Sequence, residues 1–110
     1  MAATERNHKQ LTVSASTAIS AGAQAPSGTR IAMDGFAGGS IILPSSVTGV
    51  SALNWWACKH DGSTVDTGLT AITPAANKVV QIPPELFGIR FLALKSTGAN
   101  LDGIEVHLAS

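Results

Sequence analysis

The sequence is poor in cysteine and in aromatic residues. Its 110 residues include a single cysteine, two tryptophans, three phenylalanines and no tyrosine. Cys58 cannot form an intramolecular disulfide, and we expect a buried, unreactive thiol. A chain of this length can bury about 65% of its unfolded surface without disulfides or metals. We therefore expect one domain whose stability rests on packing.

Charge is also scarce, and it is balanced. Seven Lys and Arg residues stand against seven Asp and Glu residues, so the formal net charge at pH 7 is +0. The basic residues are spread along the sequence, whereas binding to nucleic acid needs a basic patch. We therefore expect no nucleic acid among the partners. A neutral surface has little self-repulsion, and this composition suits a subunit that sits against other protein.

Long apolar runs are absent as well. No segment approaches the roughly 18 residues that a membrane span needs, and we expect no membrane association. The segment Met1–Ala25 begins with charge and ends with small residues, as a secretory signal does. Its centre, however, is interrupted by Thr12, Ser14 and Ser16, where a signal would be continuously apolar. We expect that it is not a secretory signal.

What the sequence has in abundance is a two-residue alternation of apolar and polar positions from Ile41 to Leu108. Gly, Pro and Ser/Thr clusters separate these short segments, a pattern typical of an all-β sandwich. We predict a single antiparallel β-sandwich of seven or eight strands over residues 11–110, either a jelly roll or an immunoglobulin-like Greek key. Glu85–Gly88 is predicted as one helical turn. The segments predicted as strands are Leu11–Ala15, Arg30–Met33, Ser40–Leu43, Leu53–His60, Thr64–Thr70, Lys78–Ile82, Ile89–Ser96 and Ile104–Leu108.

Three Asp-Gly pairs mark predicted reversals of the chain: Asp34-Gly35, Asp61-Gly62 and Asp102-Gly103. Asp bonds to its own nearby backbone, and Gly accepts a positive φ without a steric penalty. We therefore expect a tight turn at each pair.

Residues 1–10 show no apolar periodicity and are predicted to form an extended N-terminal arm. The alternative is simple disorder. An arm with so little apolar surface would gain order only by lying along a neighbouring subunit. In that case the charged residues Glu5, Arg6 and Lys9 are candidates for partner contacts.

Cys58, His60 and Asp61 are the candidates for catalysis or metal binding. Same-face neighbours on a strand lie about 6.5–7 Å apart, whereas a nucleophile and its base need about 3 Å. A structural metal site would need four ligands with recognisable spacing. We therefore expect no catalytic residues, no metal and no cofactor, and a protein that is not an enzyme.

The adjacent tryptophans Trp55 and Trp56 face opposite sides of their predicted strand. The face with Leu53 and Ala57 is the more apolar, so we assign Trp55 to the core. Trp56 then becomes a candidate for contact with a partner, together with Phe91. Two alternatives for Trp56 stay open: it is covered by a loop of this chain, or it stacks on a carbohydrate.

From Ile41 onward, the order of segments resembles small β-sandwich structural proteins of tailed bacteriophages, of the capsid decoration (cement or staple) type. The residues that carry this resemblance are Ile41–Pro44, the tryptophan strand into Asp61-Gly62, Ile82–Leu86 and Arg90–Ser96. The resemblance implies a non-enzymatic protein on the outer surface of the assembled capsid, clamping adjacent major capsid protein subunits. It also implies synthesis in the host cytoplasm and a homo-oligomer, dimer or trimer, on the capsid. The alternative is a receptor- or glycan-binding module of a phage fibre or tail.

Overall fold

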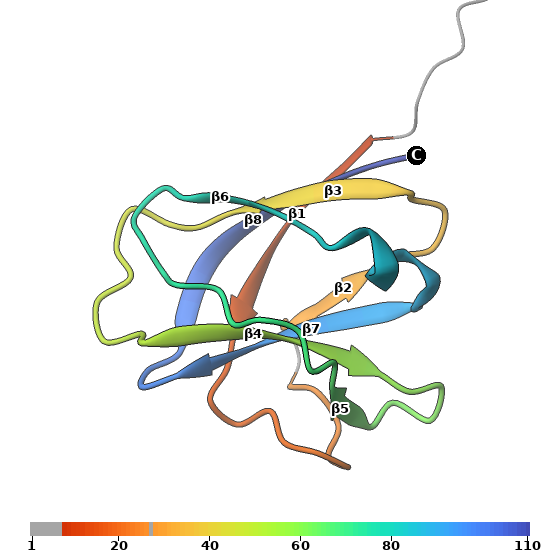
Figure 1. Ribbon diagram of the computed structural model, residues 1–110, viewed down its shortest axis with the longest axis horizontal. Helices are drawn as coiled ribbons and strands as arrows, with labels where there is room; N and C mark the ends of the chain where they lie inside the picture. The colour runs from red at the N-terminus through yellow and green to blue at the C-terminus, as the bar shows by residue number, and fades with distance from the viewer. Residues whose placement is uncertain (1–7, 27) are drawn as a thin grey trace, which may run out of the picture.

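The structure, a computed structural model, describes residues 8–26 and 28–110. Two four-stranded antiparallel sheets form a sandwich (Figure 1). Sheet A has the strand order β1-β8-β3-β6, and sheet B has the order β2-β7-β4-β5. The strands are β1 (His8–Ala15), β2 (Arg30–Ala32), β3 (Gly38–Ile42), β4 (Ala52–Cys58), β5 (Thr64–Asp66), β6 (Val79–Gln81), β7 (Phe91–Thr97) and β8 (Leu101–Ala109).

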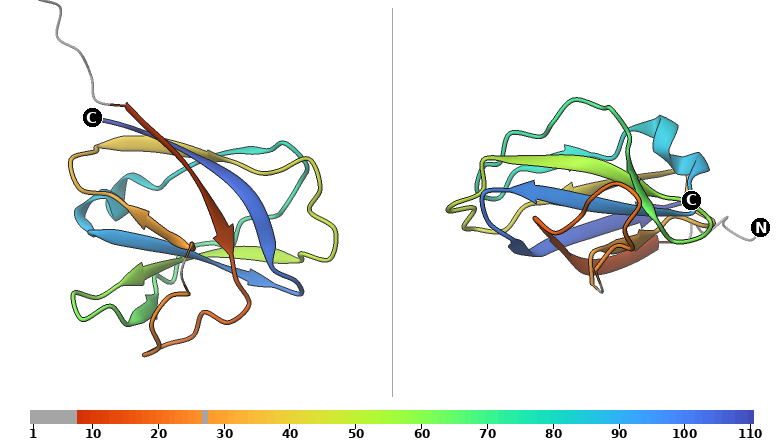
Figure 2. Two further views of the ribbon diagram at one scale, coloured as in Figure 1. Left: turned by 180° about the vertical axis from the view of Figure 1, so that it is seen from behind. Right: turned by 90° about the horizontal axis from the view of Figure 1, so that it is seen from below.

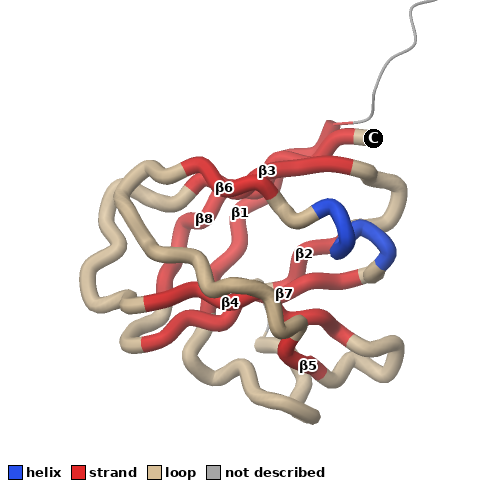
Figure 3. Tube along the Cα trace, viewed as in Figure 1, coloured by secondary structure: helices blue, strands red, loops and turns tan. Residues whose placement is uncertain are grey.

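This architecture confirms the predicted all-β antiparallel sandwich. The described residues form eight strands and the short 3-10 helix η1, Pro84–Gly88 (Figure 3). The turn forms where it was predicted, because Pro84 has the fixed φ that suits a first helical position.

The main core lies between the two sheets. Inward-facing residues alternate with outward-facing ones, as at Leu53 and Trp55 of β4 and at Ile104, Val106 and Leu108 of β8. Each of these side chains is 2% exposed or less. Burying one such side chain contributes about 1.5–3 kcal/mol relative to leaving it in water. This core is the main source of stability, as expected for a chain with no disulfide.

A second apolar cluster lies on the opposite, outer face of sheet B. The segment 16–26 folds back over this face after β1, and Figure 1 shows it in orange beside β5. Backbone hydrogen bonds fix it to β5: Gly22 N donates to Thr64 O at 2.9 Å, and Thr64 N donates to Ala23 O at 2.8 Å. The buried members of the cluster are Ile19, Ala25, Trp56, Cys58 and Ala93. Strands β4 and β7 are therefore buried on both faces, which explains why Ile89–Ser96 carries apolar residues on both of its faces.

One of the three predicted reversals is wrong. Asp102 and Gly103 lie inside β8, and the chain reverses before them, at Gly98–Asn100. Val13 of β1 pairs with Ile104, while Ala15 pairs with Leu101, so two residues of β8 oppose one residue of β1. This is a β-bulge, and the φ of 78° at Gly103 serves the bulge rather than a hairpin. Asp-Gly chemistry favours a positive φ, which a bulge needs as much as a turn does.

The first strand begins earlier than predicted, at His8 instead of Leu11. His8 and Lys9 pair with Ala109 and Leu108 of β8, so backbone pairing orders residues that have no apolar pattern of their own. Residues 8–10, assigned to the arm from the sequence, therefore belong to the sandwich. The rest of the predicted arm, residues 1–7, lies outside the described residues.

Strand β5 ends at Asp66, before the predicted end at Thr70. Gly68 has a φ of 75°, and its N–H donates to Asp66 Oδ1 at 2.9 Å. Thr67 donates its hydroxyl to Trp55 O at 2.7 Å. The turn from Asp66 to Gly68 ends the strand, while Thr67 stays bonded to Trp55 of β4.

Candidate functional site

Trp55 and Trp56 point to opposite faces of β4, as predicted. Trp55 is 2% exposed and belongs to the main core. Trp56 is 7% exposed and lies in the second cluster, where Ile19 and Ala25 of segment 16–26 cover it. The structure therefore shows the alternative in which a loop of this chain covers the indole. Little of the Trp56 surface is left for a direct partner contact.

Phe91 lies at the start of β7 and is half-buried. Its ring packs against the second cluster, and the Arg90 guanidinium carbon lies 5.5 Å from the ring centroid. Phe91 pairs with Ala32 of β2 on one side and with Cys58 of β4 on the other. This position places the ring at the end of sheet B where three strands meet.

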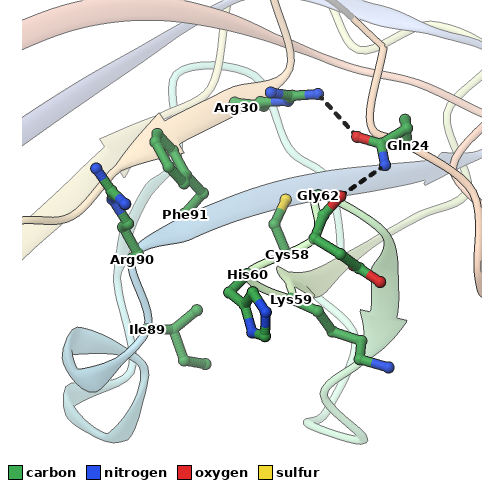
Figure 4. A pocket seen from close by; sticks show the side chains of 10 residues that line it. Gln24, Arg30, Cys58, Lys59, His60, Gly62, Ile89, Arg90 and Phe91 are labelled. Carbon is green, nitrogen blue, oxygen red and sulfur yellow. Dashed lines mark hydrogen bonds between the residues drawn. The ribbon is translucent and has the colours of Figure 1, made fainter.

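An open pocket lies at this end of sheet B, with a volume of about 430 Å³. Figure 4 shows Phe91 and Cys58 between the cationic side chains of Arg30, Arg90 and Lys59. The wall is built from β2, the end of β4 with its following turn, and the approach to β7. The lining residues are Gln24, Arg30, Cys58, Lys59, His60, Asp61, Gly62, Ile89, Arg90 and Phe91.

The Gln24 side chain bridges two walls of the pocket. Its Nε2 donates to Asp61 O at 3.0 Å, and its Oε1 accepts a long hydrogen bond of 3.5 Å from Arg30. Arg30 also donates to Ala25 O at 3.4 Å. A Cβ at Gly62 would collide with the Gln24 amide. Segment 16–26 and the turn after β4 are thus held against each other, which keeps the rim in place.

The pocket gathers positive charge that the sequence does not reveal. Arg30, Lys59 and Arg90 contribute three cations, and Asp61 is the one carboxylate among the lining residues. Arg90 Nε pairs with Asp34 Oδ2 at 3.1 Å, and both of these side chains are exposed. Roughly thirty residues of sequence separate each cation from the next, so no charge run signals the cluster. The neighbouring positions of β2, β7 and β4 in sheet B bring them together.

Cys58, His60 and Asp61 all line this pocket, as their proximity in sequence requires. Asp61 Oδ1 is engaged by Ser63, accepting hydrogen bonds from its N at 2.9 Å and its Oγ at 2.6 Å. These bonds hold the pKa of Asp61 below its usual range. Burial raises the pKa of the Cys58 thiol, partly offset by the charge of Arg30, so the thiol is protonated at neutral pH.

Nothing in the described ranges brings three or more His, Cys, Asp or Glu side chains together in a way that could hold a metal ion. Among residues 8–26 and 28–110, no helix has the length and apolar character to cross a membrane.

Lys9, the third charged candidate in the arm, lies on β1 in sheet A and is exposed. The structure places it on a different sheet from Trp56 and Phe91. Glu5 and Arg6 lie outside the described residues. The first half of β1 lies at an open edge of sheet A (Figure 2), and among described residues it pairs with β8 alone. His8, Lys9 and Gln10 are all exposed.

Comparison with known proteins finds similarity to a solved structure but not to a known sequence. No family model matches this sequence, and no curated protein sequence matches it. The fold is similar to that of the SPBc2 prophage-derived protein YomS, with a TM-score of 0.65 and 14% sequence identity. The similarity covers 100% of this chain and 99% of YomS. This chain therefore has the whole-chain fold of a protein that comes from a prophage.

Proposed function

We propose that this chain is a structural protein of a phage particle, and more specifically a capsid decoration protein. In this role it binds the outer surface of the assembled head and stabilises contacts between major capsid protein subunits. The observation that carries the proposal is the similarity of fold, from end to end, to a prophage-derived protein. The segments from Ile41 onward resemble those of decoration proteins, and this resemblance is the reason to propose the capsid as the site of binding instead of the tail or a fibre.

The open edge of sheet A supports a binding role for the N-terminal part of the chain. An unpaired strand edge presents a row of N–H and C=O groups that can pair with an added strand. His8 and Gln10 are exposed at this edge, and Lys9 adds a positive charge. We propose that this edge, with Glu5 and Arg6 just before it, lies along a major capsid protein subunit.

The mechanism is stabilisation by linkage rather than catalysis. A protein that binds the assembled shell and not its free subunits stabilises the shell by mass action. In the proposal the chain is not an enzyme and uses no cofactor. It occupies the capsid as a dimer or trimer, because an icosahedral shell offers symmetric groups of identical sites.

A receptor- or glycan-binding module of a fibre or tail is the second candidate. Stacking on a sugar ring needs an exposed aromatic face. Trp56, the aromatic residue that suggested such a site, is 7% exposed beneath segment 16–26. The geometry therefore gives the capsid role more support than the glycan role.

The direct test is to purify particles made by a cell that encodes this chain and to determine their structure by cryo-electron microscopy. We expect density with the shape of this sandwich on the outside of the capsid, repeated around a symmetry axis. Density at a tail tip or fibre would establish the second candidate instead. Particles that lack the chain altogether would overturn both.

A deletion tests the role of the arm. Removing residues 2–7 should leave the unfolding midpoint of the isolated protein unchanged, because β1 begins at His8. Occupancy on capsids should fall at matched protein concentration. If the shortened protein decorates capsids as fully as the intact one, the arm is not the docking element.

A further inference from the structure

The lining of the pocket at the end of sheet B carries more positive than negative charge, with three cations and one carboxylate. In the described part of the chain, neither Arg30 nor Lys59 forms an ion pair with a carboxylate; the ion pair at the pocket joins Arg90 to Asp34. Arg30 is satisfied by two neutral acceptors at 3.4 and 3.5 Å, which are long for a guanidinium. Asp61 is ionised, accepts hydrogen bonds from Ser63, and its charge acts on Lys59 without forming an ion pair. Arg30 is therefore the cation of the pocket most available to a ligand.

The backbone around the pocket does not offer a phosphate cradle. Phosphate sites in turns use free N–H groups that converge on the anion. Here Lys59 N donates to Ser63 O, Gly62 N donates to Lys59 O, and Ser63 N donates to Asp61 Oδ1. The turn uses these donors internally. Recognition of an anion at this site falls to the side chains.

One side of the pocket wall is apolar. Phe91 and Ile89 are half-buried at one side, and the Cys58 thiol is uncharged at neutral pH. A volume of about 430 Å³ is far larger than a single inorganic anion needs. A short peptide with one acidic side chain beside an apolar one matches both the charge and the wall.

We propose that this pocket binds an acidic loop of the partner protein, with a Glu or Asp carboxylate on the Arg30 guanidinium, the more distant charge of Lys59 adding attraction at the rim, and an apolar neighbour against Phe91. The inference rests on the proposed function, since it names the chemistry of a second contact with the partner. Arg30 can take a carboxylate through two N–H donors, and the Lys59 ammonium adds a point charge. Arg90 is less available to the ligand because it forms an ion pair with Asp34.

The first test uses the isolated, isotope-labelled chain and nuclear magnetic resonance. The probe is the capped peptide Gly-Leu-Glu-Leu-Gly, and the matched control is its Gln analogue. We expect the Glu peptide to cause saturable shifts in the Gln24 side-chain amide and in the backbone N–H groups of Lys59 and Gly62. The Gln peptide should not cause them.

Variants sharpen this titration. Arg30→Met should weaken Glu-peptide binding about tenfold or more, the value of one charge-assisted hydrogen bond, and Lys59→Met should weaken it by a smaller factor. Asp34→Asn should strengthen binding, because it frees Arg90. Lys78→Met is the matched control, since Lys78 lies before β6 of sheet A and donates to Thr73 O. Its affinity should equal that of the wild type.

Several results would overturn the inference. They are an absence of shifts at the pocket with the Glu peptide, equal binding of the Gln peptide, or tighter binding of inorganic phosphate than of the Glu peptide. The last result would assign the site to a phosphate ligand instead.

The second test separates this inference from the proposed function. Particles are prepared with the wild-type chain and with the double variant Arg30→Glu, Lys59→Glu, and occupancy is measured by quantitative mass spectrometry. Because Arg30 also donates to Gln24 and Ala25 O, the unfolding midpoint of the double variant is measured first, and occupancy is compared at a temperature at which both proteins are folded. We expect the wild-type chain to be present on the particles and the double variant to be absent from them. Equal occupancy would overturn the pocket inference alone, whereas a wild-type chain absent from particles would overturn the proposed function.

Discussion

The Lys95 ammonium nitrogen lies 5.2 Å from the centroid of the Trp56 ring, on the face of sheet B that segment 16–26 covers. The indole is thus enclosed by the loop on one side and by a cation at its border. A cation–π contact made by a partly exposed lysine contributes about 0.5–1 kcal/mol. The apolar contacts of Trp56 with Ile19 and Ala25 contribute more, which makes this residue part of the fold.

Replacement of Trp56 by Ala should therefore destabilise the isolated protein by about 3–5 kcal/mol, as for a large core deletion. Trp55→Ala should cost a similar amount from the main core. Lys95→Met, the control, should cost less than about 1 kcal/mol. Urea unfolding followed by fluorescence measures all three. A Trp56→Ala protein with wild-type stability would show that segment 16–26 does not pack on the indole.

Two adjacent glycines in β3 should respond in opposite ways to substitution by Ala. A Cβ at Gly39 would lie 2.6 Å from His107 O and 2.8 Å from Leu108 Cδ2, whereas a Cβ at Gly38 would meet nothing within 4 Å. Gly39→Ala should lower the free energy of unfolding by about 1–3 kcal/mol, because the backbone of β8 must move. Gly38→Ala should leave it unchanged or raise it by about 0.5–1 kcal/mol.

Thermal and urea unfolding of the two glycine variants decide the point. Equal effects would mean that β3 and β8 do not approach as closely at Gly39 as the register requires.

Local patterns predicted much of this fold, because they act over a few residues. Period-two alternation put Trp55 in the core and Trp56 on the opposite face, and Pro84 and Gly88 bounded the short helix. The same chemistry misled at Asp102-Gly103, where a positive φ serves a bulge. A local signal gives the backbone conformation and not the partner strand.

The pocket could not be predicted, because it depends on the order of strands. The order of strands in sheet B places β7 between β2 and β4, and this order alone brings three distant cations to one pocket: Arg30, Lys59 and Arg90. The cover over Trp56 could not be predicted for the same reason: segment 16–26 consists mostly of small residues with no clear periodicity, and its place on sheet B depends on hydrogen bonds to Thr64. From the sequence, burial of Trp56 under a loop of this chain was one of several alternatives, and nothing in the sequence could select it.

The hydrogen bonds from Ser63 to Asp61 should make turn stability depend on pH. The pKa of Asp61 lies below its ordinary value of 3.8, so the stabilisation is present above that pH and is lost as pH falls through the folded pKa. Ser63→Ala should raise the pKa of Asp61 toward the ordinary value. A titration of the Asp61 carboxyl carbon by nuclear magnetic resonance measures it in both proteins. An unchanged pKa in Ser63→Ala would contradict the assigned cause.

The pKa of Cys58 should be shifted in the opposite direction from that of Asp61. Burial raises the pKa of its thiol above the ordinary value of 9.0, while the charge of Arg30 lowers it. Arg30→Met should therefore move the pKa of Cys58 further up, and Lys78→Met should not move it. The rate of alkylation by iodoacetamide, followed against pH, reports the thiolate. Because the folded pKa is the higher one, the contribution to stability is full below pH 9.0 and is lost as pH rises through the folded value. Alkylation that is complete and fast at neutral pH would show that segment 16–26 leaves the thiol open, and would also remove the uncharged wall on which the acidic-peptide pocket depends.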